Sequence, residues 1–183
     1  MTTPIPIDLA QIAWTSGNVT RLEVAGTHVA KQLLRDDATA AIAVGHRAEF
    51  AHDTEAREVA ILLYLDLAIT TGTPPQPTGT SGRFELDFTF TVGNLRELLL
   101  DATGPEPQLQ PPLLLILLSV AYSTARGILW TRLAGTPLEG ITLPLIHPAQ
   151  LLQPAAPAAP PAAAGKKPRA AAPARPKKSK PAP

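Results

Sequence analysis

Ten residues near the middle of the chain decide the fold: RFELDFTFTV, which runs from Arg83 to Val92. Apolar side chains occupy every second position, and polar side chains fill the positions between them. The apolar set is Phe84, Leu86, Phe88, Phe90 and Val92. This alternation predicts a β-strand with one buried face and one face in water. Three of the four phenylalanines of the chain lie on the predicted buried face.

Three further strands are expected on the N-terminal side of this segment. Val59–Thr71 carries apolar residues at its odd positions, and Ala40–Phe50 shows a weaker alternation with apolar residues at even positions. The proline- and glycine-rich stretch Gly72–Gly82 predicts a loop that joins two antiparallel strands. A fourth strand is expected within Val19–Leu33, where the pattern is blurred, and Met1–Trp14 is expected to be a short extended or helical lead-in.

A long helix is predicted after the strands. Pro111 and Pro112 suit the first turn of a helix, an apolar run continues to Leu133, and Gly135 and Pro137 end it. The first half of this helix is apolar almost all round, which predicts burial on more than one side. One sheet face cannot provide that burial, so the pattern favours self-association.

Two shorter elements complete this part of the chain. Asn94–Asp101 is expected to form a short helix or a further edge strand, and Asn94 would be the N-cap of such a helix. Thr103–Gln110 is expected to be a loop. Gly140–Leu152 contains two prolines that favour an extended path from Leu143 to Pro148, followed by a terminal helical turn.

Charge divides the chain into two parts. Residues 154–183 contain nine prolines, twelve alanines and seven lysines or arginines, with no acidic residue. The remaining nine basic residues face 15 acidic ones in residues 1–153, which are therefore acidic by six charges. The composition of residues 154–183 cannot bury a core. The sequence predicts one domain over residues 1–153 and a disordered basic tail over residues 154–183.

The composition also limits the location of the protein. There is no cysteine, which excludes disulfides and thiolate metal sites and fits a reducing compartment. Met1–Ala10 lacks the basic start of a secretory signal. The most apolar run, Leu113–Val120, is far shorter than the roughly 20 residues that span a bilayer. We expect a cytoplasmic protein that does not insert into a membrane.

Catalytic and metal-binding patterns are missing from the sequence. The four histidines show no metal-ligand spacing, and no phosphate-binding loop or nucleophile motif occurs. His46 is interpreted as a core or rim histidine with a hydrogen-bond partner, and His147 as a structural cap. The sequence therefore predicts a binding protein that is not an enzyme and needs no metal or cofactor.

The basic tail allows two interpretations. Its lysines and arginines could contact nucleic acid or an anionic surface, but it has no aromatic side chain for base stacking. A solubilising extension is the simpler interpretation, because the acidic body would repel DNA. The sequence therefore argues against a nucleic-acid partner.

Two C-terminal segments resemble the SecB-like family. They are Tyr122-Ser-Thr-Ala-Arg126-Gly, within the predicted helix, and Leu143-Pro-Leu-Ile-His-Pro148, within the predicted extended path. The order of the predicted elements matches the family as well. The resemblance covers roughly residues 19–152 and is nearest to the divergent SecB-like proteins of Bacteroidetes-type bacteria.

The resemblance implies an α+β fold. A four-stranded antiparallel sheet would carry one long helix and a short C-terminal helical segment on one face, in a homo-oligomer built as a dimer of dimers. The implied function is that of a chaperone that keeps preproteins unfolded for export in apolar grooves, without ATP. The alternatives are a non-chaperone interaction module or an antitoxin-specific chaperone of the same fold, each with one dedicated partner.

The resemblance also assigns candidate residues. The client groove would involve Phe84, Trp130, Leu143 and Ile146, and Phe88 maps there too, although plain core packing is the favoured interpretation for Phe88. Glu85 and Asp87 would form an acidic face that docks the translocase motor SecA. The long basic tail departs from the family's usual C-terminus, so delivery to the motor stays an open question.

Overall fold

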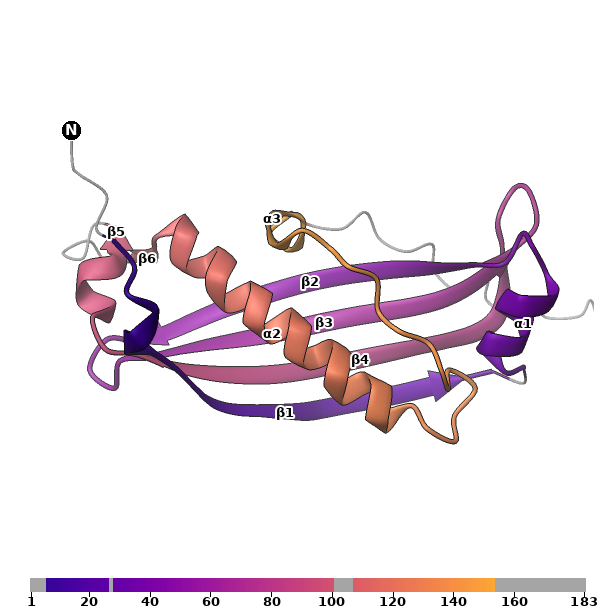
Figure 1. Cartoon of the computed structure of the whole chain (residues 1–183), viewed down its shortest axis with the longest axis horizontal. Coiled ribbons are helices and arrows are strands. Elements are labelled where there is room, and N and C mark those ends of the chain that lie inside the picture. Colours follow the sequence, from indigo (N-terminus) through magenta and orange to yellow (C-terminus); the bar gives the residue numbers. More distant parts are fainter. Residues whose placement is uncertain (1–5, 27, 101–106, 154–183) are drawn as a thin grey trace, which may run out of the picture.

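The computed structural model describes residues 6–26, 28–100 and 107–153. The predicted tail, residues 154–183, lies outside the described residues, as do residues 103–106 of the predicted loop Thr103–Gln110. The described chain has an α+β architecture in which a single long sheet is covered on one face by one long helix (Figure 1).

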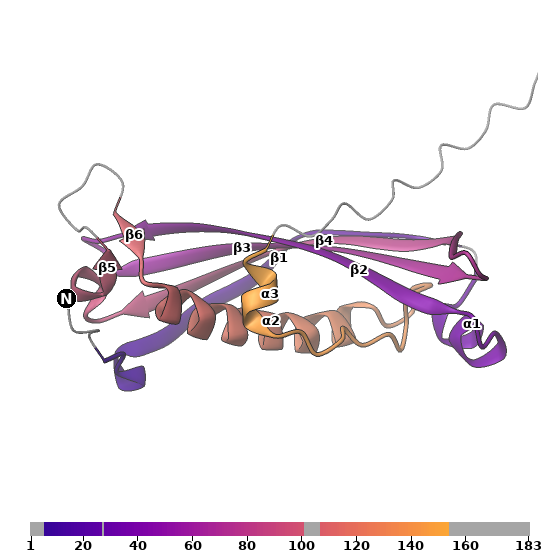
Figure 2. The ribbon, with the colours of Figure 1, turned by 90° about the horizontal axis from the view of Figure 1, so that it is seen from above.

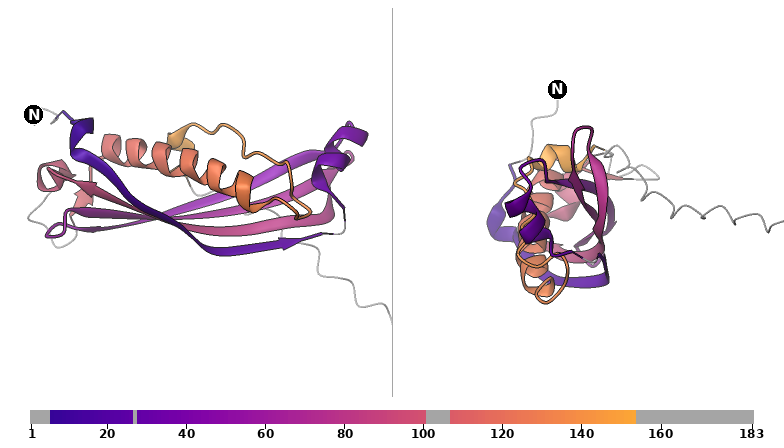
Figure 3. Two further views of the ribbon diagram at one scale, coloured as in Figure 1. Left: turned by 60° about the horizontal axis from the view of Figure 1, so that its bottom comes forward. Right: turned by 90° about the vertical axis from the view of Figure 1, so that its right-hand side faces the viewer.

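Four long strands form the sheet: β1 (Ile12–Ala25), β2 (Ala41–Asp53), β3 (Glu58–Thr71) and β4 (Gln76–Val92). Their spatial order is β1-β4-β3-β2, and every neighbouring pair is antiparallel. The predicted four-stranded antiparallel sheet is therefore confirmed. The sheet twists strongly along its length, as Figure 3 shows.

The core lies on the face of the sheet that we call the inner face. In β3 and β4 the alternating apolar residues face each other in register, for example Ile61 opposite Phe88 and Leu63 opposite Leu86. All four of these side chains are fully buried. The segment that opened the analysis therefore forms the centre of the core, as its alternation predicts.

The predicted loop Gly72–Gly82 is wrong over most of its length. The hairpin turn occupies only residues 72–75, and β4 begins at Gln76. Gln76 and Pro77 pair with β3, and Ser81 and Gly82 pair with both β3 and β1. A side chain at Gly82 would lie 2.5 Å from the ring of Phe84. This glycine therefore makes room for core packing inside a strand and does not mark a loop.

The fourth strand is present, but it starts earlier than predicted. It is β1, which begins at Ile12, while residues Ala30–Asp36 form the short helix α1. Register shifts occur between Trp14 and Ser16 and between Val19 and Arg21. Each bulge adds one residue and so reverses the parity of the side chains that follow. This explains why the alternation looks blurred in the sequence.

Helix α2 (Pro111–Arg132) crosses the inner face diagonally, and the predicted long helix is confirmed (Figures 1 and 2). Its buried side is made of Leu113, Leu117, Leu118, Ala121, Tyr122, Ala125 and Leu129. By length and composition alone α2 would be able to cross a membrane. Here it packs against β3 and β4, so this helix belongs to the core.

Small elements connect β4 to α2. The 3-10 helix η2 (Leu95–Leu98) and the short strands β5 (Leu99–Leu100) and β6 (Gln108–Leu109) lie at one end of the sheet. Asn94 is the N-cap residue of η2, as expected, but its side chain makes no capping hydrogen bond. The expectation of a short helix or an edge strand over Asn94–Asp101 is met by both elements in succession, up to Leu100.

After α2 the chain returns along the helix and ends in a single helical turn, α3 (Pro148–Leu151), beside β2. His147 caps this turn, since its Nδ1 accepts a hydrogen bond from the backbone N–H of Ala149 at 3.2 Å. The Nε2 of His46 lies 2.9 Å from the carbonyl oxygen of Gln150. Both predicted structural histidines are confirmed, and together they fasten the end of the domain to the sheet.

Candidate functional site

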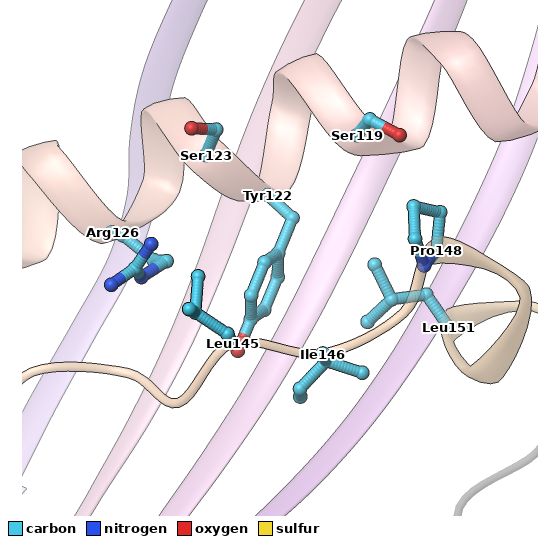
Figure 4. Close-up of a pocket in the computed structure, with 8 residues that line it drawn as sticks. All are labelled: Ser119, Tyr122, Ser123, Arg126, Leu145, Ile146, Pro148 and Leu151. Atoms are coloured by element: carbon cyan, nitrogen blue, oxygen red, sulfur yellow. The ribbon is translucent and has the colours of Figure 1, made fainter.

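A pocket lies between α2 and the extended segment 141–147 (Figure 4). Its volume is about 170 Å³. The lining residues are Ser119, Tyr122, Ser123 and Arg126 from the helix, Leu145 and Ile146 from the segment, and Pro148 and Leu151 from α3. The two prolines of the segment favour its extended path, which leaves its side chains to line the pocket.

Two hydrogen bonds hold the segment at a fixed distance from the helix. Tyr122 donates its hydroxyl to the carbonyl oxygen of Pro144 at 2.9 Å, and the Nε of Arg126 donates to the carbonyl oxygen of Leu143 at 3.0 Å. These two side chains are one helical turn apart, so they point to the same side of α2. The pocket therefore has a defined width.

Burial raises the pKa of Tyr122 to about 12, although the positive charge of Arg126 acts in the opposite direction. The hydroxyl is therefore protonated at neutral pH and acts as a donor to Pro144. Arg126 is half-buried, and among the described residues no carboxylate forms an ion pair with it. The pocket thus combines apolar walls with one positive charge.

Large apolar side chains are exposed at this pocket, on α2 and on the inner face of β1. Leu145 is 86% exposed, Trp130 54% and Val120 41%. On the neighbouring edge strand β1, Trp14 is 55% exposed and Leu22 is 37% exposed. Exposed apolar area of this kind is typical of surfaces that bind polypeptides.

The structure separates the four residues that the resemblance assigns to a client groove. Phe84 is fully buried and Leu143 is 4% exposed, so both belong to the core of the folded chain. Ile146 is half-buried and lines the pocket, and Trp130 is exposed. Only Ile146 and Trp130 are available to a partner without opening the core.

Sequence reasoning missed two of the most exposed apolar residues. Leu145 lies between Pro144 and Ile146, and its position in a segment without periodicity gave no sign of its exposure. Trp14 was assigned to the lead-in, but it lies in β1, where its indole N–H donates to the carbonyl oxygen of Ser16 at 2.7 Å. The one signal in the sequence for an exposed apolar residue here was the tryptophan itself.

Glu85 and Asp87 lie on the face of the sheet opposite α2, which we call the outer face. Glu85 is paired with Arg21 at 3.3 Å and lies opposite Tyr64 in the register. Asp87 lies between Leu62 and Asn18. Glu85 and Asp87 therefore lie on the same face of the sheet, but Arg21 partly neutralises the charge of Glu85.

Among residues 6–26, 28–100 and 107–153 no three His, Asp or Glu side chains gather in an arrangement that could hold a metal ion. A second pocket, at the end of the sheet, is lined by residues 54, 55, 57 and 93–97, with Arg57 and Arg96 facing Glu55 and Glu97. Its balanced charges select no particular ligand.

Comparison with known proteins gives one informative result. No protein-family model and no curated protein matches the sequence. The architecture, however, is that of a SecB-like chaperone. A solved structure of the Mycobacterium tuberculosis SecB-like chaperone Rv1957, in complex with a ChAD peptide from the antitoxin HigA1 (Rv1956), superposes with a TM-score of 0.53. The match covers 75% of this chain and 91% of that chain at 12% identity.

This likeness establishes the fold. At 12% identity the two sequences share too little for residue roles to be transferred. The conclusion about the fold rests on the order of the strands, the single helix that covers one face and the extended segment after it. What the site binds has to be argued from its own side chains.

Proposed function

We propose that this protein is a SecB-like chaperone that holds unfolded polypeptide segments on its inner face and in the pocket beside α2. The observation that carries the proposal is the group of exposed apolar side chains around a pocket whose width is fixed by Tyr122 and Arg126. The solved SecB-like neighbour is in complex with a peptide, which supports a polypeptide as the class of ligand.

The pocket suits single apolar side chains of an extended segment. Its volume of about 170 Å³ is that of one or two aliphatic side chains, and Leu145 and Ile146 provide apolar contact. Burial of apolar area releases about 25 cal/mol per Å². This capture is exergonic by itself, so the proposal needs no nucleotide and no specific client sequence.

The proposal includes self-association through the outward side of α2. Val120 lies on that side and is 41% exposed. A dimer of dimers would cover it, and light scattering on the purified protein measures the mass of this assembly. Service in protein export with SecA, and a cytoplasmic location, belong to the same proposal. The lack of cysteine fits that location.

Suppression of aggregation tests the function directly. We expect the purified full chain, at several-fold excess and without nucleotide, to delay aggregation of an unfolding client. Leu145→Ser should weaken binding of a fluorescent apolar peptide by about tenfold, which corresponds to about 1.4 kcal/mol of lost apolar burial. Leu9→Ser is the matched control, because Leu9 is 63% exposed and is absent from the pocket lining.

Two outcomes would contradict the proposal. Unchanged aggregation at several-fold excess would exclude a general holding activity. Equal losses of peptide affinity in Leu145→Ser and Leu9→Ser would move the binding site away from the pocket. Both variants change exposed side chains, so circular dichroism should show native folding in each.

A second candidate is a chaperone or interaction module with one dedicated partner, such as an antitoxin. The peptide bound to the solved neighbour comes from an antitoxin, and Arg126 gives the pocket a charge that favours segments with a carboxylate. A pull-down that returns one stoichiometric protein would favour this candidate. Recovery of many unfolded proteins would favour the first.

A further inference from the structure

The outer face of the sheet has no partner among the described residues. Figure 2 shows α1, α2 and α3 on the side of the inner face, so no described helix covers the opposite side. The outer face carries small apolar side chains on β2 and β3, namely Ala41, Ala43, Ala51, Ala60, Leu62 and Ala68. Carboxylates and arginines lie between them.

The strand register places these charges in rows across β2, β3 and β4. One row contains Asp53, Glu58 and Thr91, and another contains Glu49, Leu62 and Asp87. Neither row contains a basic residue. The half of the outer face nearest the β2–β3 turn is therefore acidic.

The arginines of this face are already paired. Arg47 binds Glu49 at 2.9 Å, Arg83 binds Asp66 at 3.1 Å, and Arg21 binds both Glu23 and Glu85. The face holds these three arginines and more than twice as many carboxylates, so it keeps a net negative charge. Arg57, in the adjacent turn, is accompanied by Glu55.

Residues 154–183 have the complementary composition. They contain seven basic residues, no acidic one, and otherwise mostly alanine and proline. We propose that this segment docks on the outer sheet face of its own chain, with its lysines and arginines beside Glu49, Glu58 and Asp87 and its alanines beside Ala51, Ala60 and Leu62. This interaction does not require the proposed binding of clients on the inner face, although it shares Asp87 with the surface that the resemblance assigns to SecA.

The exit point of the chain favours this occupant. The last described residues follow α3, which is fastened to edge strand β2 through the 2.9 Å contact between His46 and Gln150. Lys166 follows Gln153 by thirteen positions along the chain. A proline-rich segment reaches about 3.1 Å per residue, or about 40 Å in total. Asp53 lies seven residues from His46 along β2, about 23 Å at strand spacing, well within that reach.

Tethering makes weak contacts sufficient. An exposed ion pair contributes only about 0–1 kcal/mol, and an untethered segment of this composition would bind weakly. A segment joined to the same chain acts at an effective concentration on the order of mM. Because the charges are exposed, their attraction acts over roughly 10 Å at moderate salt and weakens as salt is added.

Disulfide trapping in the full chain tests the docking, because the protein has no cysteine of its own. Ser179→Cys places a thiol between Lys178 and Lys180. It is paired with Thr89→Cys on the outer face or, as the control, with Ser123→Cys on the exposed side of α2. We expect the outer-face pair to form an intrachain disulfide about tenfold faster at low salt, and to lose most of this advantage at about 0.5 M salt.

Charge variants make the test specific. Glu49→Gln with Glu58→Gln and Asp87→Asn should remove the rate advantage of the outer-face pair. The matched variant Asp36→Asn with Asp37→Asn and Glu139→Gln removes three carboxylates elsewhere in the domain and should leave it unchanged. Equal rates for the two cysteine pairs, an advantage that persists at high salt, or disulfides only between chains would each overturn the proposal.

Discussion

Strand β1 pairs along its whole length with residues Ser81 to Val92 of β4, yet the inner faces of the two strands differ sharply in burial. Phe84, Phe88 and Phe90 of β4 are at most 1% exposed, whereas Trp14 and Leu22 of β1 are 55% and 37% exposed. The difference arises because α2 packs against β3 and β4 and covers their inner faces. One strand therefore supplies the core, and its neighbour leaves apolar side chains exposed.

The largest expected effect concerns the buried strand. Phe88→Ala removes a fully buried aromatic side chain and should lower the free energy of unfolding by about 3–5 kcal/mol. Trp14→Ala, its counterpart on β1, should lower it by only about 1 kcal/mol. Urea denaturation of both variants measures the contrast. Similar losses would mean that β1 is as well covered as β4, in the chain itself or in its oligomer.

A second variant tests how closely the two strands approach. A Cβ at Gly17 of β1 would lie 2.9 Å from the ring of Phe88 and 3.1 Å from that of Trp14. The exposed indole can move aside, but the buried phenyl ring cannot. Gly17→Val should therefore cost about 1–3 kcal/mol, again measured by urea denaturation. A loss below that range would show that β1 moves away from β4 easily.

The same two strands show what the sequence alone can predict. β4 is readable from Arg83 onward because its alternation is unbroken and its buried residues are large. The starts of β4 and β1 are misplaced, because Gly82 makes room for Phe84 and because two bulges reverse the parity of β1. Local rules treat a glycine or a lost alternation as a loop, whereas here both result from tertiary packing.

The residues of the candidate site were likewise only partly predictable from the sequence. Trp130 and Ile146 were predicted and lie where a partner can reach them, whereas Phe84 and Leu143 were predicted and are core. Leu145 was missed, because its 86% exposure follows from how α2 holds the extended segment. That arrangement depends on hydrogen bonds to backbone carbonyls, which no sequence pattern reports.

The third prediction concerns the hydrogen bond that holds this segment over the buried strands. Tyr122→Phe removes the donor to Pro144 and should cost about 1 kcal/mol at neutral pH. The raised pKa of Tyr122, about 12, adds a pH signature. The folded chain holds this proton more tightly than an unfolded tyrosine, whose pKa is about 10. The contribution of Tyr122 to the free energy of unfolding is therefore fully present below pH 10 and is lost as the pH rises toward 12.

Denaturation midpoints of both proteins between pH 9 and about pH 12 measure this effect. The native chain should lose more stability over this range than Tyr122→Phe does. Parallel losses in the two proteins would mean that Tyr122 is not protected by the segment. The phenolate absorbance of the variant, which retains Tyr64 alone, separates the two titrations.

The smallest expected effect is on the outward side of α2, which in the single chain is as open as the inner face of β1. A Cβ at Gly127 would meet no atom within 4 Å, and glycine inside a helix is about 0.5–1 kcal/mol less favourable than alanine. Gly127→Ala should therefore stabilise the chain by that amount at low protein concentration. If this side of α2 packs closely against another copy, the added methyl group should weaken association. Light scattering across a dilution series then shows whether the outward side of α2 becomes buried in an oligomer, as the inner face of β4 is buried in the chain, or stays exposed like the inner face of β1.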